Sequence, residues 1–196
     1  MATEKEPAAS KPALPTATLL IGLAAVLVFF FPATSAPLIY QRGLILDGEI
    51  WRAWTGHLVH LGPSHLVWDL AVFLVAGCWL ERLRPKGARW FYLVSPLVIA
   101  TVLLGFDPGL ERYAGLSGVA TGVLVFLACL QLGESRAEPR WFWLAVLALV
   151  ALKIGLETVT HTPLLVSGFS GARVVPLAHV SGAICGLATW AISIRW

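Results

Sequence analysis

Three stretches of this sequence place chemically capable polar side chains inside segments that are otherwise apolar. The first, "HLVHLGPSHLVWDL" at 57–70, contains His57, His60, His65 and Asp69. The second, "GLSG", contains Ser117, and the third, "AHVSG", contains His179. A serine whose proton can pass to a histidine is an activated nucleophile, and N–H groups at a helix N-terminus can stabilise an oxyanion. Together these residues predict acyl transfer, for which the obvious substrate inside a membrane is a peptide bond.

The elements that position these side chains are predicted to be membrane helices. The chain has 196 residues, of which 58% are hydrophobic and 13% charged, whereas about a quarter of the residues in a soluble domain are charged. Six apolar runs approach the roughly 20 residues that a helix needs to cross a bilayer: 16–31, 63–82, 89–106, 116–132, 141–159 and 175–194. We expect an all-α, polytopic membrane protein with a six-transmembrane-helix bundle at 16–196, after a polar, disordered cytoplasmic N-terminus at 1–15.

The second apolar run carries a pair of polar side chains on one helix face. Gly62-Pro63 marks its start, because proline is favoured at the first helical position, and the preceding "WRAWTGHLVHLG" is then an outside loop or interfacial segment. His65 falls in the first turn, and Asp69 lies four residues on, one turn deeper on the same face. His60 is left in the loop just above them, and we interpret His57 as interfacial.

The fourth and sixth runs are predicted to pack closely. From Ser117 to Leu132 the fourth helix has only about 24 Å of length, so its outer end should lie below the membrane surface. His179 lies about one turn into the sixth helix. Pairs of small residues let membrane helices approach until their backbones nearly touch, which would bring Ser117 and His179 within hydrogen-bonding distance. The pairs are Gly118 with Gly122 and Gly182 with Gly186.

The basic residues predict the orientation in the membrane. With six spans, one side carries Lys5, Lys11, Arg82, Arg84, Lys86, Arg89, Arg136, Arg140 and Arg195, and the other carries Arg42, Arg52, Arg112 and Arg173. The richer side is cytoplasmic by the positive-inside rule, which places both termini in the cytoplasm. The first run resembles a secretory signal, but Pro37 would follow the scissile bond, so we keep this run as a helix. The basic loops are explained by topology, and no nucleic-acid partner is expected.

At this point the sequence resembles a known family. "WRAWTGHLVHLGPSHLVWDL", the glutamate in "CWLER" (Glu81), "GLSG" and "AHVSGAICG" resemble the rhomboid family of intramembrane serine proteases in order and spacing. The resemblance implies that Ser117 is the nucleophile and His179 the general base of a dyad. It implies that His65 donates a hydrogen bond to the oxyanion, with Asp69 where a second donor is usual. His60 matches a loop histidine of structural importance. Arg52 and Glu81 match family positions that tie the first loop and the inner end of the second helix.

One branch, the rhombosortases, is more similar still in its small six-helix core and in the "GHLVH…SHLVWDL" segment. Membership would imply a bacterial inner-membrane enzyme with its site near the periplasmic face. Its substrates would be exported proteins that end in a Gly-Gly stretch, a transmembrane helix and a basic tail. No metal or organic cofactor is implied.

Several alternatives stay open at the level of sequence. Asp69 replaces an asparagine common in rhomboids, and it could act as a neutral carboxyl donor or orient His65. Thr121 replaces a tyrosine that often packs under the histidine. Both departures favour a catalytically inactive rhomboid-like protein that binds membrane clients. A metal site at the four polar residues of 57–70 lacks the HExxH spacing. Lys153 and Glu157, at i and i+4, are expected to pair with each other; a transporter is disfavoured because the polar groups cluster at one end of the bundle.

Overall fold

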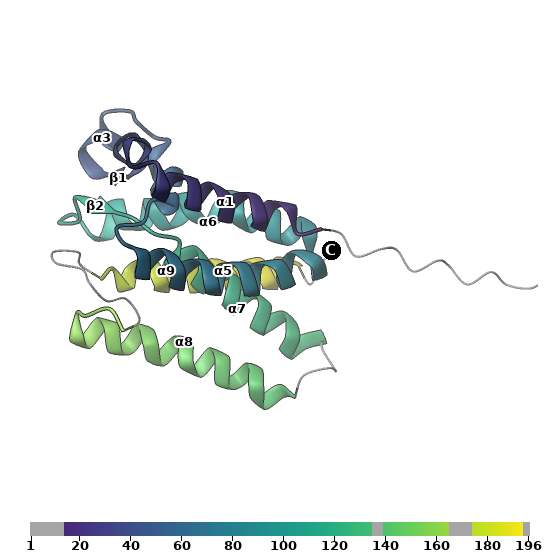
Figure 1. Ribbon diagram of the computed structural model, residues 1–196. Helices are drawn as coiled ribbons and strands as arrows, with labels where there is room; N and C mark the ends of the chain where they lie inside the picture. Colours follow the sequence, from purple (N-terminus) through teal and green to yellow (C-terminus); the bar gives the residue numbers. More distant parts are fainter. Residues whose placement is uncertain (1–13, 135–138, 165–173, 194–196) are drawn as a thin grey trace, which may run out of the picture.

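Six long helices dominate the structure, a computed structural model that describes residues 14–134, 139–164 and 174–193. They lie side by side, and α1 begins at the end of the bundle where α9 finishes (Figure 1). Their bounds follow the six apolar runs closely, which confirms the predicted all-α bundle. The helices are α1 (Thr16–Phe30), α5 (Pro63–Leu83), α6 (Pro85–Phe106), α7 (Ser117–Glu134), α8 (Arg140–Thr160) and α9 (Pro176–Ser193).

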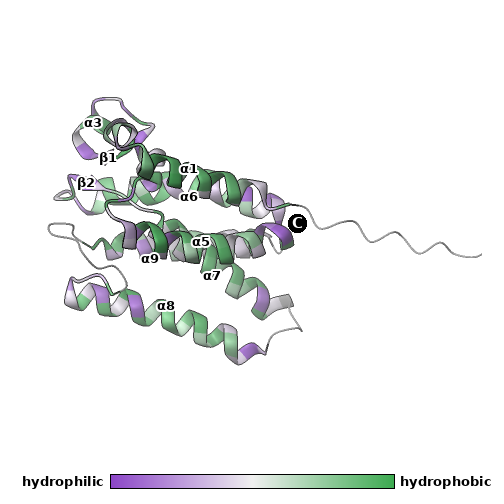
Figure 2. Ribbon diagram, in the orientation of Figure 1, coloured by the Kyte–Doolittle hydropathy of each residue, from purple (hydrophilic) through white to green (hydrophobic). Residues whose placement is uncertain are grey.

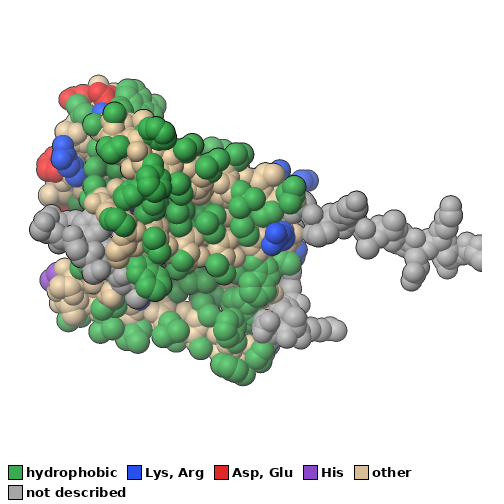
Figure 3. Space-filling view, in the orientation of Figure 1, with side chains coloured by type: hydrophobic (Ala, Val, Ile, Leu, Met, Phe, Trp, Pro, Cys, Tyr) green, Lys and Arg blue, Asp and Glu red, His purple; other side chains and the backbone are tan. Residues whose placement is uncertain are grey.

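The outer surface of the bundle is suited to lipid. Apolar residues colour the helices along most of their length (Figure 2), and hydrophobic side chains cover the visible face between charged groups at its two ends (Figure 3). Within the described residues, α6, α8 and α9 are each long and apolar enough to cross a membrane. Two further spans result if each of two bent helix pairs is one span, and α7 is a shorter apolar helix.

The connection between α1 and α5 folds into short elements over one end of the bundle. In chain order they are η1 (Pro32–Thr34), α2 (Ser35–Leu38), β1 (Tyr40–Gln41), α3 (Arg42–Leu46), α4 (Arg52–Thr55) and η2 (Gly56–Leu58). The buried Arg52 holds them together, because its guanidinium donates to the carbonyls of Ala36 and Ile39 and to the Glu49 carboxylate. The segment "WRAWTGHLVHLG" is thus a folded cap and not an open loop.

A small antiparallel pairing connects this cap to the segment that leads into α7. Strand β1 pairs with β2 (Arg112–Tyr113), with Tyr40 opposite Tyr113. The amide of Gly115 donates to the carbonyl of Gly56 just beyond the strands. These bonds fix the backbone immediately before Ser117, so the cap positions the start of α7.

The opposite end of the bundle is fixed by a buried carboxylate. Glu81, near the end of α5, accepts hydrogen bonds from the amides of Ala17 and Thr18 and from the Thr18 hydroxyl. Arg89, at the start of α6, also donates to it at 3.2 Å. These bonds satisfy amides at the start of α1, where no intrahelical acceptor is present. They agree with the expectation that Glu81 ties the inner end of the second long helix.

Helices α7 and α9 pack through glycine, as the sequence predicted. A methyl group placed on Gly118 would lie 2.9 Å from the carbonyl oxygen of Ala178, and one on Gly182 would lie 2.8 Å from the carbonyl carbon of Gly118. Gly122 and Gly186 meet the facing backbone in the same way. Any side chain at these positions would separate the two helices, so glycine permits the approach that the site requires.

Candidate active site

Ser117 is the first residue of α7 and follows a turn that only glycine fits comfortably. Gly115 has φ +117°, a backbone conformation that residues with a Cβ rarely adopt. A methyl group there would also meet the imidazole Nε2 of His65 and lie 3.0 Å from a carboxylate oxygen of Asp69. The turn therefore brings the start of α7, whose first N–H groups have no acceptor within the helix, directly against these two side chains of α5.

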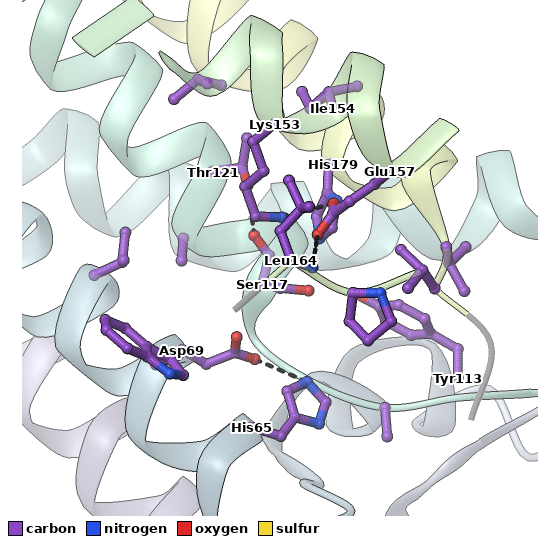
Figure 4. Close-up of a pocket in the computed structure, with 18 of the residues that line it drawn as sticks. His65, Asp69, Tyr113, Ser117, Thr121, Lys153, Ile154, Glu157, Leu164 and His179 are labelled. Atoms are coloured by element: carbon purple, nitrogen blue, oxygen red, sulfur yellow. Dashed lines mark hydrogen bonds and ion pairs between the residues drawn. The ribbon is translucent and has the colours of Figure 1, made fainter. Parts of the chain in front are cut away.

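His179 approaches the same point from α9. Its helix begins at Pro176, so the imidazole lies about one turn in, and it is 5% exposed. Ser117 and His179 line one cavity of about 1180 Å³, together with His65 and Asp69. Figure 4 shows these four labelled side chains around the same space. The structure thus brings together the serine, the histidine and the polar pair that the sequence predicted to meet.

His60, His65 and Asp69 form a compact cluster beside Ser117. One oxygen of Asp69, Oδ2, lies 3.2 Å from Nε2 of His60 and 3.2 Å from Nε2 of His65. The other ring nitrogen of His60 lies 3.1 Å from the carbonyl of Leu58, and the amide of Leu116 donates to its Nε2 at 3.4 Å. His60 therefore links the cap, α5 and the start of α7, and Asp69 contacts both imidazoles.

This cluster is also the set among the described residues that could hold a metal ion. One ligand atom each from His60, His65 and Asp69 lies within 4.8 Å of the others. His57, the fourth residue of the sequence-based metal alternative, points elsewhere: its Nε2 lies 3.2 Å from the carbonyl of Pro96. The four residues do not converge, and Asp69 already uses one oxygen for both imidazoles, so the geometry favours a hydrogen-bonded cluster.

His57 and Tyr113 pack against each other beside the turn that precedes Ser117. His57 was expected to be interfacial, but its side chain is buried, and its ring centre lies 5.2 Å from that of Tyr113. The Tyr113 hydroxyl donates to the carbonyl of Gly115 at 3.2 Å. Burial raises the pKa of Tyr113, and the nearby Ser117 side chain and Gly118 amide offset this only in part. The hydroxyl therefore stays protonated and keeps its hydrogen bond to the Gly115 carbonyl in the turn before Ser117.

A buried carboxylate of α8 reaches the other side of His179. Glu157 Oε2 lies 3.0 Å from His179 Nδ1 and 2.7 Å from the ammonium nitrogen of Lys153. The His179–Glu157 separation is that of a hydrogen bond, although the ring N–H points away from the direct line to the oxygen. Figure 4 shows Lys153, Glu157 and His179 grouped next to Ser117. The predicted Lys153–Glu157 pair is confirmed, but it has a third member.

Comparison with known proteins identifies the family. A family model described as the rhomboid domain matches residues 47–196, which is most of the chain. The chain belongs to the rhomboid family. This confirms the family resemblance read from the sequence, and the chain is accordingly an integral membrane protein. Rhomboid proteases are intramembrane serine proteases, so the predicted enzyme class is confirmed at the level of the family.

Two curated rhomboids illustrate how far the similarity extends. The chain is 28% identical over 144 residues to the rhomboid protease GlpG of Haemophilus influenzae, which covers 72% of this chain and 68% of that protein. It is 24% identical over 147 residues to the rhomboid protease GluP of Bacillus subtilis, which covers 74% of this chain but 26% of that protein. The chain therefore spans about a quarter of one relative and about two thirds of the other.

Sequence reasoning located the rhomboid motifs but missed two side chains of the site. Tyr113 gave no signal, because a single tyrosine before a glycine-rich turn is common. Glu157 stood out as a charged residue in an apolar run, but pairing with Lys153, four residues before it on the same helix face, explained it sufficiently. Thr121, which lines the cavity, donates to the carbonyl of Ser117 within its own helix. Residues 165–173 and the N-terminal segment 1–13 lie outside the described residues.

Proposed function

We propose that this rhomboid cleaves a peptide bond of transmembrane substrates with a Ser117–His179 dyad. The observation that carries the proposal is the convergence of Ser117, at the start of α7, and the buried His179 on one cavity, enforced by the glycine packing of α7 against α9. His179 Nε2 takes the proton of Ser117 Oγ as the oxygen attacks the substrate carbonyl. The same imidazole then returns the proton to the leaving nitrogen, and water releases the acyl group.

The oxyanion would form between the start of α7 and His65. N–H groups at a helix N-terminus point outward and favour negative charge, and His65 stands directly across the Gly115 turn from them. Oδ2 of Asp69 lies 3.2 Å from Nε2 of both His60 and His65, so we assign Asp69 an orienting role and not that of a neutral donor. A fixed imidazole loses less freedom when the oxyanion forms, which is how preorganised donors lower a barrier.

The cavity has the composition expected of a site for a membrane segment. Apart from the polar groups around Ser117, its walls are mostly aliphatic residues of α5, α7 and α8. Helix α8 has little buried surface within the bundle, and we propose that a substrate helix enters beside it. An intact helix shields its carbonyls, so the substrate must unwind next to Ser117 before attack.

The substrate class that we propose is the exported protein with a Gly-Gly stretch, a transmembrane helix and a basic tail. The similarity of the sequence at 56–70 to rhombosortases supports this branch. The site lies at the end of the bundle opposite the start of α1 and the end of α9 (Figure 1). With the basic residues on the cytoplasmic side, we place the site near the periplasmic face of a bacterial cell membrane and both termini in the cytoplasm.

The test is co-expression with a reporter that ends in Gly-Gly, a membrane helix and a basic tail, followed by a blot for its C-terminal tag. Wild type should release the tag, and Ser117→Ala and His179→Ala should not. A second reporter that bears a general rhomboid substrate segment separates the sorting branch from proteolysis as such. If wild type cuts neither reporter but both wild type and Ser117→Ala retain them in a pull-down, the inactive client-binding alternative replaces the protease.

A further inference from the structure

We propose that Glu157 is a positioning residue for His179, so that the site works as a Ser117–His179–Glu157 triad assembled from three helices. This rests on the proposed protease function and adds a residue to it. Serine and histidine alone leave the imidazole free to rotate and to exchange its tautomer. A carboxylate on Nδ1 holds that proton in place and leaves Nε2 to accept the proton of Ser117.

The first support is geometric. Glu157 Oε2 lies 3.0 Å from His179 Nδ1, on the side of the ring opposite the nitrogen assigned to Ser117. The side chains of Glu157 and His179 are only 3% and 7% exposed, respectively. A carboxylate is costly to remove from water and is retained where it has partners. The ring N–H points off the line to the oxygen, and a small rotation of the imidazole straightens the bond, as expected of catalytic hydrogen bonds that tighten only once substrate is bound.

The second support is the way Glu157 is itself held. Lys153 donates to the same oxygen, Oε2, at 2.7 Å, and the amide of Leu164 donates to Oε1 at 3.4 Å. The carboxylate is therefore fixed in an orientation that presents Oε2 to His179. Lys153 also places a positive charge beside the carboxylate, which compensates its negative charge. When His179 takes the proton from Ser117, the new imidazolium faces a negative charge that is already in place.

The third support is the position of Glu157 in the fold. It is one of two buried residues described on α8, the other being Trp143 toward the far end of that helix. Most of this helix faces outward, and one of its two described buried residues is Glu157, whose carboxylate lies next to His179. Pairing with Lys153 does not by itself require the carboxylate to lie against the general base, yet Oε2 of Glu157 lies 3.0 Å from Nδ1 of His179.

The experiment compares purified variants in detergent, with cleavage kinetics and with the rate at which a fluorophosphonate probe labels Ser117. Glu157→Gln keeps the shape of the side chain and removes its charge. We expect kcat and the labelling rate to fall by about 10²-fold, the lower end of what a general base contributes, with KM changed less than about twofold because substrate contacts remain. Thr158→Ala is the matched control, since Thr158 is exposed and donates only to the carbonyl of Ile154.

A double variant keeps the test decisive if the single one leaves Lys153 unpaired and fails to fold. Glu157→Gln with Lys153→Met removes both charges, so the thermal unfolding temperature should match that of wild type while the loss in kcat persists. Wild-type kcat and labelling in this stable double variant would overturn the triad and leave the dyad intact. Failure of wild type itself to cleave or to label would instead overturn the proposed protease function.

Discussion

Replacing Gly182 by alanine perturbs the contact between α7 and α9 where the nucleophile and the base are brought together. The added methyl group would lie 2.8 Å from the carbonyl carbon of Gly118 and still closer to its oxygen. Carbon atoms in contact are separated by about 3.5 Å or more, so the two helices must move apart by at least about 0.7 Å. Gly118 follows Ser117, and Gly182 lies one turn beyond His179. Moving the helices apart at this point therefore increases the distance between the two catalytic side chains.

The expected loss follows from that displacement. A misplacement of about 1 Å at a reacting pair costs about 10²-fold in rate, so we expect kcat/KM for Gly182→Ala to fall by between about 10-fold and 10²-fold. Overpacking costs about 1–3 kcal/mol, whereas alanine gains about 1 kcal/mol over glycine in a helix interior. The net change in the free energy of unfolding should therefore be a loss of about 1 kcal/mol, too small to explain the loss of activity by unfolding.

The assay is cleavage of the Gly-Gly reporter, with thermal unfolding in detergent measured on the same preparations. Gly133→Ala is the matched control, because a methyl group at Gly133, in α7, meets nothing within 4 Å. The control should keep wild-type activity and be as stable as wild type or slightly more stable. Gly182→Ala cleaving at the wild-type rate would refute the reasoning that close approach of α7 and α9 sets the catalytic geometry.

Three further predictions concern the groups around this core. Gly115→Ala requires an alanine to adopt φ +117° and places its Cβ against His65. We expect a destabilisation of about 1–3 kcal/mol, and reporter cleavage lowered by about 10²-fold if His65 moves by about 1 Å. An active, stable variant would contradict the assigned turn. Glu81→Gln removes the charged acceptor of the Thr18 amide and hydroxyl. The free energy of unfolding should fall by about 1.5–3 kcal/mol, measured as a lower unfolding temperature, while kcat of the folded fraction stays unchanged. A lower kcat would show that the effect reaches the site. Because the folded pKa of Tyr113 lies above the ordinary value of 10.0, its contribution to stability is fully present below about pH 10 and is lost as the pH rises further; thermal unfolding at alkaline pH should show a shallower decline in Tyr113→Phe, and an identical decline would refute the assignment.

The helices were predictable because their cause is local. A bilayer requires about 20 apolar residues with all backbone groups bonded within the segment, so the runs in the sequence are the helices in the fold. The start of α5 at Pro63 and the start of α7 at Ser117 follow from residue preferences at helix ends. The cap between α1 and α5 was not predictable in detail, since its short elements are fixed by Arg52 and by the β1–β2 pairing across the chain.

The site was predictable where glycine spacing and motif order carry the geometry. Gly118 and Gly182 can lie in contact only if α7 and α9 pack at that point, and Ser117 and His179 then face one cavity. The hydrogen-bond partner of each polar side chain could not be predicted in the same way. Asp69 could have been a lone donor or could have oriented His65, and the structure shows one oxygen equally distant from His65 and His60.

The sequence by itself determined the six long helices, the two residues proposed for the dyad and the glycine-lined contact that brings them together, because each depends on spacing along a single helix. The tertiary structure alone decided that His57 turns to Pro96 and that Glu157 reaches His179. Each contact joins two separate elements of the fold, and each residue had an adequate local interpretation without it. Hydrogen-bond partners are chosen by which groups become buried side by side, and that is settled only when the helices pack.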